Sequence, residues 1–144
     1  MALKQYDPRD VIVTWGPILF RGFSDGTFVT IEYDEDATTK HVGAKGDVTV
    51  TVSANRSGMG TVTLGQASPV NDQLSAILAI QRQPGAGLQK YPFMMKHVNG
   101  TTLASSAEAW IKKSPNGEFG DDHSPREWPF DFADLEMSVG GSVR

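Results

Sequence analysis

Residues 47–53 read DVTVTVS, a run in which polar and apolar side chains alternate at every position. In an extended chain the three valines point to one side, and the acidic and hydroxyl side chains point to the other. Residues 27–34 (TFVTIEYD) repeat this pattern, and Thr61–Leu64 continues it after a glycine-rich bend at 58–60. The sequence therefore predicts three neighbouring antiparallel strands with one dry face and one polar face.

Further strands and one helix complete the predicted fold. Two hairpins and a closing strand pair are predicted at residues 11–23, 93–111 and 127–139. In the closing pair, Trp128, Phe130 and Phe132 fall at every second position, as in a strand with one apolar face. A helix is predicted over about 69–83, because Ser68 can cap its start and apolar side chains recur at helical spacing from Val70 to Leu78. The fold class is mainly β, with antiparallel sheets in a sandwich or barrel-like arrangement, one flanking helix and a single domain over 1–144.

A polar stretch interrupts the strand pattern at residues 35–46. It has no apolar rhythm and is too long for a tight hairpin turn, so it is predicted to project from the body as an arm. Together with the residues that continue it, the arm spans about 35–60. Its candidate contact residues are Glu35, Asp36, Lys40, His41 and Lys45.

Composition limits what the chain can bind. The 144 residues include 13 Lys and Arg, 17 Asp and Glu and no Cys, for a net charge of -4. The lack of cysteine excludes thiol nucleophiles, thiolate metal sites and disulfides. A net negative chain is unsuited to gripping nucleic acid or an anionic membrane, because both require clustered Lys and Arg. No run resembles a secretion signal or a bilayer-spanning segment, so no membrane anchor is expected.

Two short motifs resemble catalytic or metal-binding sites, but the residues around them do not fit those sites. Residues 22–26 (GFSDG) match the nucleophile elbow of serine hydrolases, but strand-forming residues follow where that motif requires a helix. Residues 121–123 (DDH) lack the second anchored pair of ligands that a metal site needs. The sequence therefore assigns no catalytic, metal-binding or cofactor-binding residue.

The polar face of the predicted strands carries hydroxyls and carboxylates but no Lys or Arg. Exposed strands ordinarily mix charges of both signs, and edge strands use Lys against aggregation. If copies closed into a ring with this face inward, the channel would repel phosphate and let a polyanion slide through. The residues predicted to line this lumen are Thr30, Glu32, Asp34, Asp47, Thr49, Thr51, Ser53, Thr61 and Thr63.

Taken in order, several segments resemble tail tube proteins of contractile-tailed bacteriophages. These segments are 53–58 (SANRSG), 61–64 (TVTL), 68–74 (SPVNDQL), 99–102 (NGTT), 109–111 (AWI) and 126–128 (REW). The resemblance covers nearly the whole chain, from Tyr6 to the final strands, and it rests on the order and spacing of the segments together. The loops at 84–92 and 114–125 match no pattern of that family.

This resemblance implies a structural virion protein that is assembled in the host cytoplasm into six-membered rings, which stack into the inner tube of a tail. It also implies that the arm reaches the next ring. Tail sheath, baseplate and tail-terminator proteins are then the expected partners. Viral double-stranded DNA is expected to pass through the lumen into the host without specific binding.

The residues leave three other functions open. One is the tube protein of a contractile injection or secretion device, which passes proteins rather than DNA. Another is a monomeric carbohydrate-binding β-sandwich that uses Trp15 or Trp128. A third is a hydrolase that uses Ser24.

Overall fold

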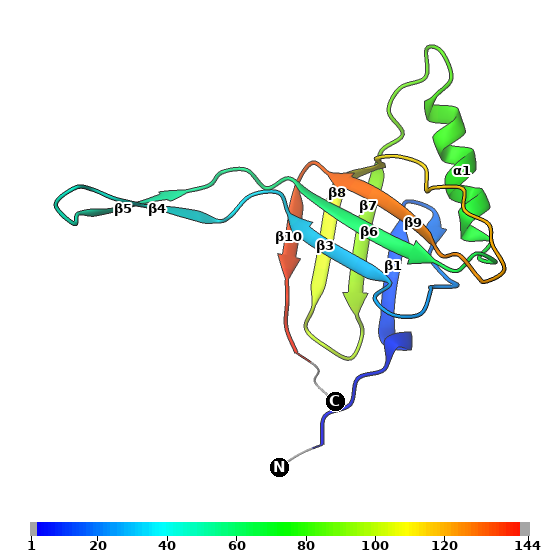
Figure 1. The fold of residues 1–144 in the computed structure, drawn as a ribbon, viewed down its shortest axis with the longest axis horizontal. Helices are drawn as coiled ribbons and strands as arrows, with labels where there is room; N and C mark the ends of the chain where they lie inside the picture. The colour runs from blue at the N-terminus through cyan, green and yellow to red at the C-terminus, as the bar shows by residue number, and fades with distance from the viewer. Residues whose placement is uncertain (1–2, 142–144) are drawn as a thin grey trace.

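The computed structural model describes residues 3–141 and consists of two layers of antiparallel strands, one helix and a long projecting hairpin (Figure 1). The helical segments are the 3-10 turn η1 (Pro8–Asp10) and the helix α1 (Val70–Gln81). The strands are β1 (Val11–Trp15), β2 (Ile18–Leu19), β3 (Val29–Tyr33), β4 (Thr38–Val42), β5 (Val48–Val52), β6 (Gly58–Leu64), β7 (Tyr91–His97), β8 (Leu103–Ile111), β9 (Arg126–Phe132) and β10 (Leu135–Ser138). The predicted class, mainly β with antiparallel sheets and a flanking helix, is confirmed.

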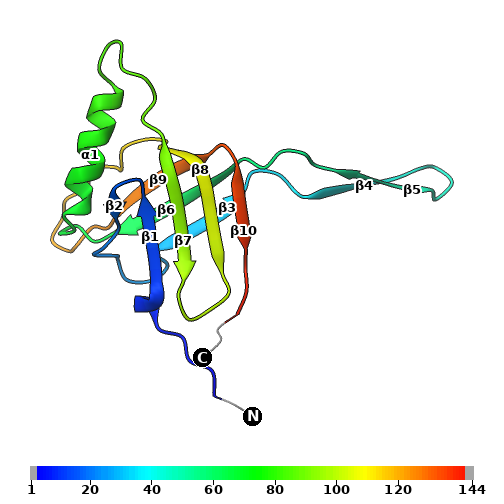
Figure 2. The same cartoon turned by 180° about the vertical axis from the view of Figure 1, so that it is seen from behind.

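Strand β8 joins the two layers. The strands pair in the order β2-β1-β7-β8-β9-β6-β3, and β10 also pairs with β8. The first part of β8, residues 103–106, pairs with β10, whereas residues 109–111 pair with β9. Strand β9 thus leaves the β1-β7-β8-β10 layer and carries β6 and β3 across its face (Figures 1 and 2). Because β3 and β1 are not paired, the sandwich stays open on that side and does not close into a barrel.

Aromatic side chains from both layers fill the core. Trp15 on β1 lies edge-on to Phe130 on β9 with 5.2 Å between ring centroids, and Phe93 on β7 lies 4.9 Å from Phe132. All four side chains are buried. The indole of Trp15 also donates a hydrogen bond to the carbonyl of Ala109 at 3.0 Å, so its buried N–H is satisfied. The alternation predicted for the closing strands is therefore a genuine inward face.

The helix starts differently from the sequence prediction. It begins at Val70, and the buried hydroxyl of Ser68 donates to the carbonyl of Arg21 at 2.6 Å instead of capping the helix. The prediction that Ser68 is the N-cap is therefore wrong, because this side chain fastens the helix start to the β2–β3 connection. Asn71 makes a second attachment, since its side-chain oxygen accepts from the indole N–H of Trp128 at 2.9 Å. Within the described residues, no helix has the length and apolar character needed to cross a membrane.

The glycines at 58 and 60 do not form a bend. Both lie inside strand β6, between β3 and β9. A Cβ on Gly58 would lie 2.5 Å from a methyl carbon of Leu135, and one on Gly60 would lie 2.9 Å from the ring of Phe132. Glycine is present here because core side chains need the space above the strand, and not because the chain turns.

The arm contains a hairpin, and this corrects the predicted position of residues 47–53. Among the residues that the structure describes, strand β5 pairs only with β4, so it does not lie beside β3 and β6. Residues 35–46 are likewise not a featureless loop, because they supply β4. Every residue of the hairpin is exposed, including its valines, and the hairpin extends away from the sandwich (Figures 1 and 2). The predicted projection is confirmed, but the valines of β5 do not face the core.

Candidate assembly surfaces

The outer face of the β3-β6-β9 layer is acidic and rich in hydroxyls. The strand pairing sets Thr30 opposite Thr61, which lies opposite Pro129, and sets Glu32 opposite Met59, which lies opposite Asp131. Thr63 likewise faces Glu127 on β9. Since directly opposed residues share a face of the sheet, these side chains form one continuous surface, which we call the acid face. It comprises Thr30, Glu32, Met59, Thr61, Thr63, Glu127, Pro129 and Asp131.

The structure brings together four of the residues predicted to line a lumen and separates the others from them. Thr30, Glu32, Thr61 and Thr63 lie on the acid face. Asp34 follows the end of β3, where its carboxylate accepts a hydrogen bond from the hydroxyl of Ser57 at 2.8 Å. The remaining predicted residues, Asp47, Thr49, Thr51 and Ser53, lie on or beside the hairpin and not next to the others.

Two acidic residues of this face were not among those predicted from the sequence. Glu127 and Asp131 alternate with the buried Trp128, Phe130 and Phe132 along β9. This alternation could have located them, because residues between inward-pointing aromatic side chains on a strand must point outward. The face also has a cationic neighbour that the sequence did not place: Lys113 lines a hollow of about 300 Å³ together with Thr61, Glu127 and Pro129. Beside β9, Lys112 follows the end of β8 and stands opposite Pro129, whose carbonyl accepts from its backbone N–H at 2.9 Å. Strands β3, β6 and β9 themselves contribute no Lys or Arg to the acid face.

Hydroxyl groups fasten the base of the arm. The hydroxyl of Ser53 donates to the carboxylate of Glu35 at 3.1 Å, and that of Ser57 donates to Asp34. The backbone N–H of Asp34 also donates to the carbonyl of Ser57 at 3.1 Å. Bonds to a carboxylate are stronger than those between neutral groups, so they orient the arm relative to the sandwich. Of the predicted arm residues, Glu35 and Asp36 lie at this base, Lys40 and His41 lie on β4, and Lys45 lies in the turn before β5.

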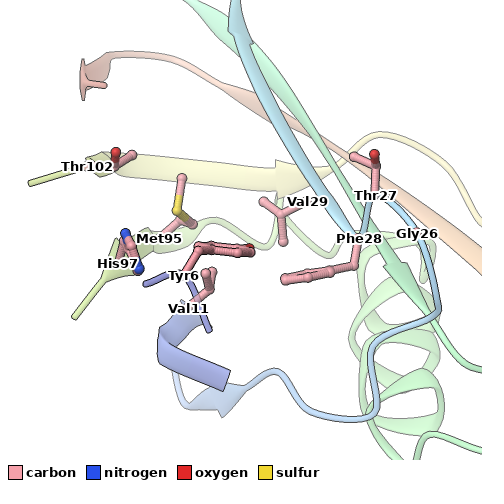
Figure 3. Close-up of a pocket in the computed structure, with 9 residues that line it drawn as sticks. All are labelled: Tyr6, Val11, Gly26, Thr27, Phe28, Val29, Met95, His97 and Thr102. Carbon is pink, nitrogen blue, oxygen red and sulfur yellow. The ribbon is translucent and has the colours of Figure 1, made fainter. Parts of the chain in front are cut away.

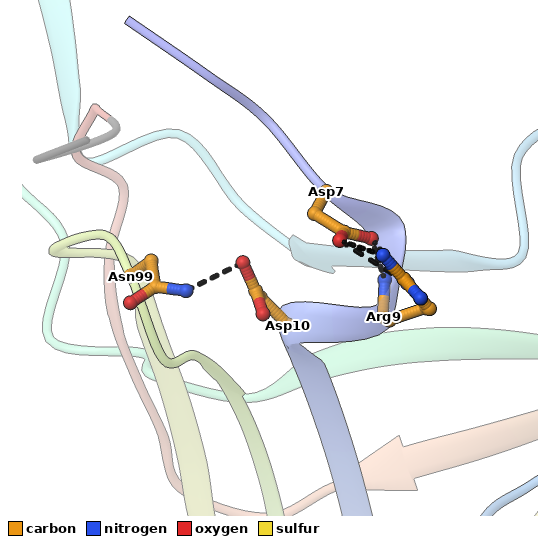
Figure 4. Close-up of polar contacts among 4 residues, drawn as sticks. All are labelled: Asp7, Arg9, Asp10 and Asn99. Carbon is orange, nitrogen blue, oxygen red and sulfur yellow. Dashed lines mark hydrogen bonds and ion pairs between the residues drawn. The ribbon is translucent and has the colours of Figure 1, made fainter.

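A tight polar turn precedes the first strand (Figure 4). The guanidinium of Arg9 donates to both carboxylate oxygens of Asp7, with a shortest N–O distance of 2.7 Å. These hydrogen bonds lower the pKa of Asp7 to about 2, and the same contact raises the pKa of Arg9. Asp10 accepts a hydrogen bond from the side-chain amide of Asn99, which links the turn to the β7–β8 connection.

A pocket of about 370 Å³ lies on the open side of the sandwich, between β3 and the ends of β1 and β7 (Figure 3). The ring of Tyr6 lies in this pocket, edge-on to His97 with 5.6 Å between ring centroids. His97 is buried, and its Nε2 has no hydrogen-bond partner within the described residues. The walls are otherwise mostly apolar, with Val11, Phe28, Val29 and Met95 among them.

The alternative sites weighed from the sequence lack the geometry that they need. Ser24 lies in the β2–β3 connection, where its backbone N–H donates to Thr63, and no helix follows it. His123 accepts from the backbone N–H of Gln66, and residues 3–141 contain no group of three side chains suited to a metal ion. Trp15 and Trp128 are buried, so the carbohydrate-binding hypothesis that used them as stacking surfaces is wrong.

Comparison with known proteins shows the family of the chain. A family model described as the bacteriophage PhiTE tail tube protein matches residues 19–140. The chain belongs to this phage tail tube family. A relative in Pseudomonas phage KPP10, called structural protein ORF10, is 30% identical over 123 residues, which are 85% of this chain and 71% of the relative. The tail tube resemblance noted from the sequence is thus confirmed, and the protein is a structural component of the tail and not an enzyme.

Solved structures with the same fold come from contractile injection devices. A sheath/tube terminator of the extracellular contractile injection system PVC has a TM-score of 0.66 at 16% identity, covering 96% of this chain and all of that one. The tube-terminating cap of the anti-feeding prophage has a TM-score of 0.64 at 13% identity, covering 96% and 95%. A chain of the PVC sheath–tube complex has a TM-score of 0.55 at 17% identity, covering 90% and 88%. At these identities the likeness describes the fold alone.

Proposed function

We propose that this tail tube protein forms hexameric rings, which stack into the inner tube of a phage tail and make the channel for genome ejection. The observation that carries the proposal is the acid face, on which β3, β6 and β9 present carboxylates and hydroxyls and contribute no cation. Turned inward and repeated around a ring, it would present Glu32, Glu127 and Asp131 of every copy to the passing DNA. Like charge then keeps the phosphates from binding the wall.

The affinity that a basic wall would have for DNA explains why an acidic wall is useful. A protein that makes 6–10 phosphate contacts binds DNA non-specifically with Kd values of roughly 10⁻⁴–10⁻⁶ M at physiological salt. A tube would repeat those contacts over its whole length and hold the genome. We therefore assign the lumen to the acid face, with Thr30, Thr61 and Thr63 as neutral hydroxyls between the charges.

The hairpin arm is the second part of the proposal. It extends from the sandwich, and the apolar side chains along it are exposed in a single copy. We assign it to the contact with the adjacent ring, which includes the predicted arm residues Glu35, Asp36, Lys40, His41 and Lys45. Asp47, Thr49, Thr51 and Ser53 belong to this arm, so their lumen role requires the arm to lie along the inner wall.

Other parts of the proposal follow from the tube itself. Sheath, baseplate and tail-terminator proteins are the partners expected around and at the ends of such a tube, and assembly takes place in the host cytoplasm before the virion is complete. The alternative that the sequence left open is a contractile injection or secretion device that passes proteins, and the shared fold does not separate the two. The neighbouring genes test this alternative, because capsid and terminase genes belong with a complete phage.

The proposal is tested with charge-reversed tubes. Phage that carry Glu32→Lys and Asp131→Lys should assemble tails but eject DNA slowly, and the matched Glu32→Gln and Asp131→Asn phage should eject normally. Because Lys–phosphate contacts weaken steeply between about 50 and 200 mM salt, added salt should shorten the delay. Normal ejection through Lys-bearing tubes would remove the acid face from the lumen. If concentrated protein shows no stacked rings by electron microscopy, the tube proposal itself fails.

A further inference from the structure

The connection from β8 to β9 carries the most exposed aromatic side chain of the described chain. This side chain is Phe119, which is 82% exposed. We call residues 114–125 the Phe119 loop. The connection passes beside α1, at the end of the sandwich away from the arm (Figures 1 and 2). Burying an apolar ring is favourable, so this side chain gains free energy when a partner covers it.

The Phe119 loop is held in shape within a single copy. The guanidinium of Arg126 donates to the carbonyls of Glu118 at 3.0 Å and Ser124 at 3.1 Å, and so bridges the loop. The same guanidinium lies 5.0 Å from the centroid of the Phe119 ring, a cation–π contact. The backbone N–H of Ser124 also donates to the side chain of Gln66 at 3.0 Å. Because these contacts order the loop before it binds, docking costs little conformational entropy.

The same molecule has an apolar hollow beside β1 and β2, which we call the β1–β2 groove. Its volume is about 500 Å³, and its apolar walls include Ile12, Leu19, Phe23 and Phe28. The rings of Phe23 and Phe28 lie 4.7 Å apart between centroids, and Leu19 is 58% exposed. Aromatic rings pack well against one another, so the groove suits a further ring.

The loop and the groove carry opposite charge. The Phe119 loop contains three acidic residues and no Lys or Arg. The charged residues that line the groove are Arg9 and Arg21. Within residues 3–141, Arg9 is paired with Asp7, whereas Arg21, Asp121 and Asp122 take part in neither observed ion pair. A negative loop with an aromatic anchor therefore complements a positive groove with aromatic walls.

The strand order sets the two features on opposite sides of the acid face. Strands β9, β6 and β3 are neighbours in that order. The Phe119 loop leads directly into β9, whereas Phe28 of the groove directly precedes β3. In a ring that turns the acid face inward, the β9 side of one copy meets the β3 side of the next. A loop on one side and a hollow on the other make a head-to-tail contact, which repeats from copy to copy around a ring.

We propose that the Phe119 loop of one copy docks in the β1–β2 groove of the next copy in the ring. The Phe119 ring packs against Phe23 and Phe28 of that copy, and the carboxylates of Asp121 and Asp122 lie near its Arg21. The inference rests on the proposed function and deepens it by naming a contact within the ring. This contact is separate from the arm, which is assigned to the adjacent ring.

Truncating the anchor tests the loop. Phe119→Ala should raise the critical concentration for tube assembly at least about tenfold, equivalent to 1.4 kcal/mol of lost contact. The Tm of the free subunit should stay within about 2 °C of wild type, because the ring is exposed there. The matched control is Leu88→Ala, an exposed apolar side chain in the loop after α1, which should change neither quantity. Equal critical concentrations for wild type and Phe119→Ala would overturn the docking of the loop.

Charge reversal tests the groove. Arg21→Glu alone, and Asp121→Lys together with Asp122→Lys, should each raise the critical concentration at least about tenfold, because like charges then face each other. All three substitutions in one chain should return it towards the wild-type value. Arg82→Glu, an exposed arginine at the end of α1, is the control and should assemble as wild type does.

The combined variant separates this inference from the proposed function. If it assembles no better than its two parents, the pairing of loop and groove is overturned while the tube itself stands. A wild-type protein that forms no rings or tubes would overturn both.

Discussion

Replacing Gly60 by Ala should destabilise the protein, although glycine to alanine in a strand ordinarily stabilises it. The new Cβ would lie 2.9 and 3.0 Å from two ring carbons of Phe132 and 3.3 Å from the carbonyl oxygen of Thr30. Phe132 is buried and its ring is held against Phe93, so it cannot move aside freely. Forcing a methyl group into a packed core costs about 1–3 kcal/mol.

The size and sign of the effect make the prediction measurable. At roughly 2–4 °C of Tm per kcal/mol for a chain of this size, Gly60→Ala should lower Tm by roughly 2–12 °C. Differential scanning calorimetry of the unassembled subunit measures this shift. Gly117→Ala is the matched control, since a Cβ there meets nothing within 4 Å. That variant should melt within about 2 °C of wild type, or slightly higher, because alanine restricts the unfolded chain. If both variants melt together, Phe132 does not exclude a side chain from position 60.

Three further outcomes are expected. Asn71→Ala removes the acceptor for the buried indole N–H of Trp128, so the free energy of unfolding should fall by about 1–3 kcal/mol in urea titrations. A carboxyl titration by NMR should give Asp7 a pKa of about 2, so its contact with Arg9 is complete above pH 3.8 and lost as the pH falls through about 2; Arg9→Ala should return that pKa towards 3.8. Replacing residues 36–52 by a short Gly-Ser turn should leave the Tm of the subunit within about 2 °C, since the hairpin buries no side chain, while it weakens tube assembly; an unchanged yield of tubes would remove the arm from the contact.

Much of the sandwich could be predicted from the sequence because its strands bury one face. The alternation of Trp128, Phe130 and Phe132 identified β9 and its inward side. The two glycines of β6 predicted a bend that is not there, because the sequence alone does not reveal that Leu135 and Phe132 occupy the space above them. Ser68 was misassigned for a similar reason, since its partner is a carbonyl 47 residues away in the chain.

In the arm, the sequence pattern predicts the strand but not its position in the fold. The DVTVTVS run predicts a strand with one apolar face, and β5 is such a strand. Alternation does not specify what covers that face: the core of the same copy and the surface of another copy require the same valines. The acid face was found in part because β3 and β6 do pair, whereas its β9 residues, Glu127 and Asp131, needed the observed strand order.

The exposed hairpin affects how assembly of a tube begins. In a lone subunit the two strands of the hairpin are held by each other and by a few bonds at the base, and its valines stay exposed until a neighbouring copy packs against the arm, as proposed. When each subunit buries its exposed surface only on joining a polymer, nucleation is slow and elongation of an existing end is fast. The number of tails in an infected cell would then follow the number of starting platforms supplied and not the concentration of this protein.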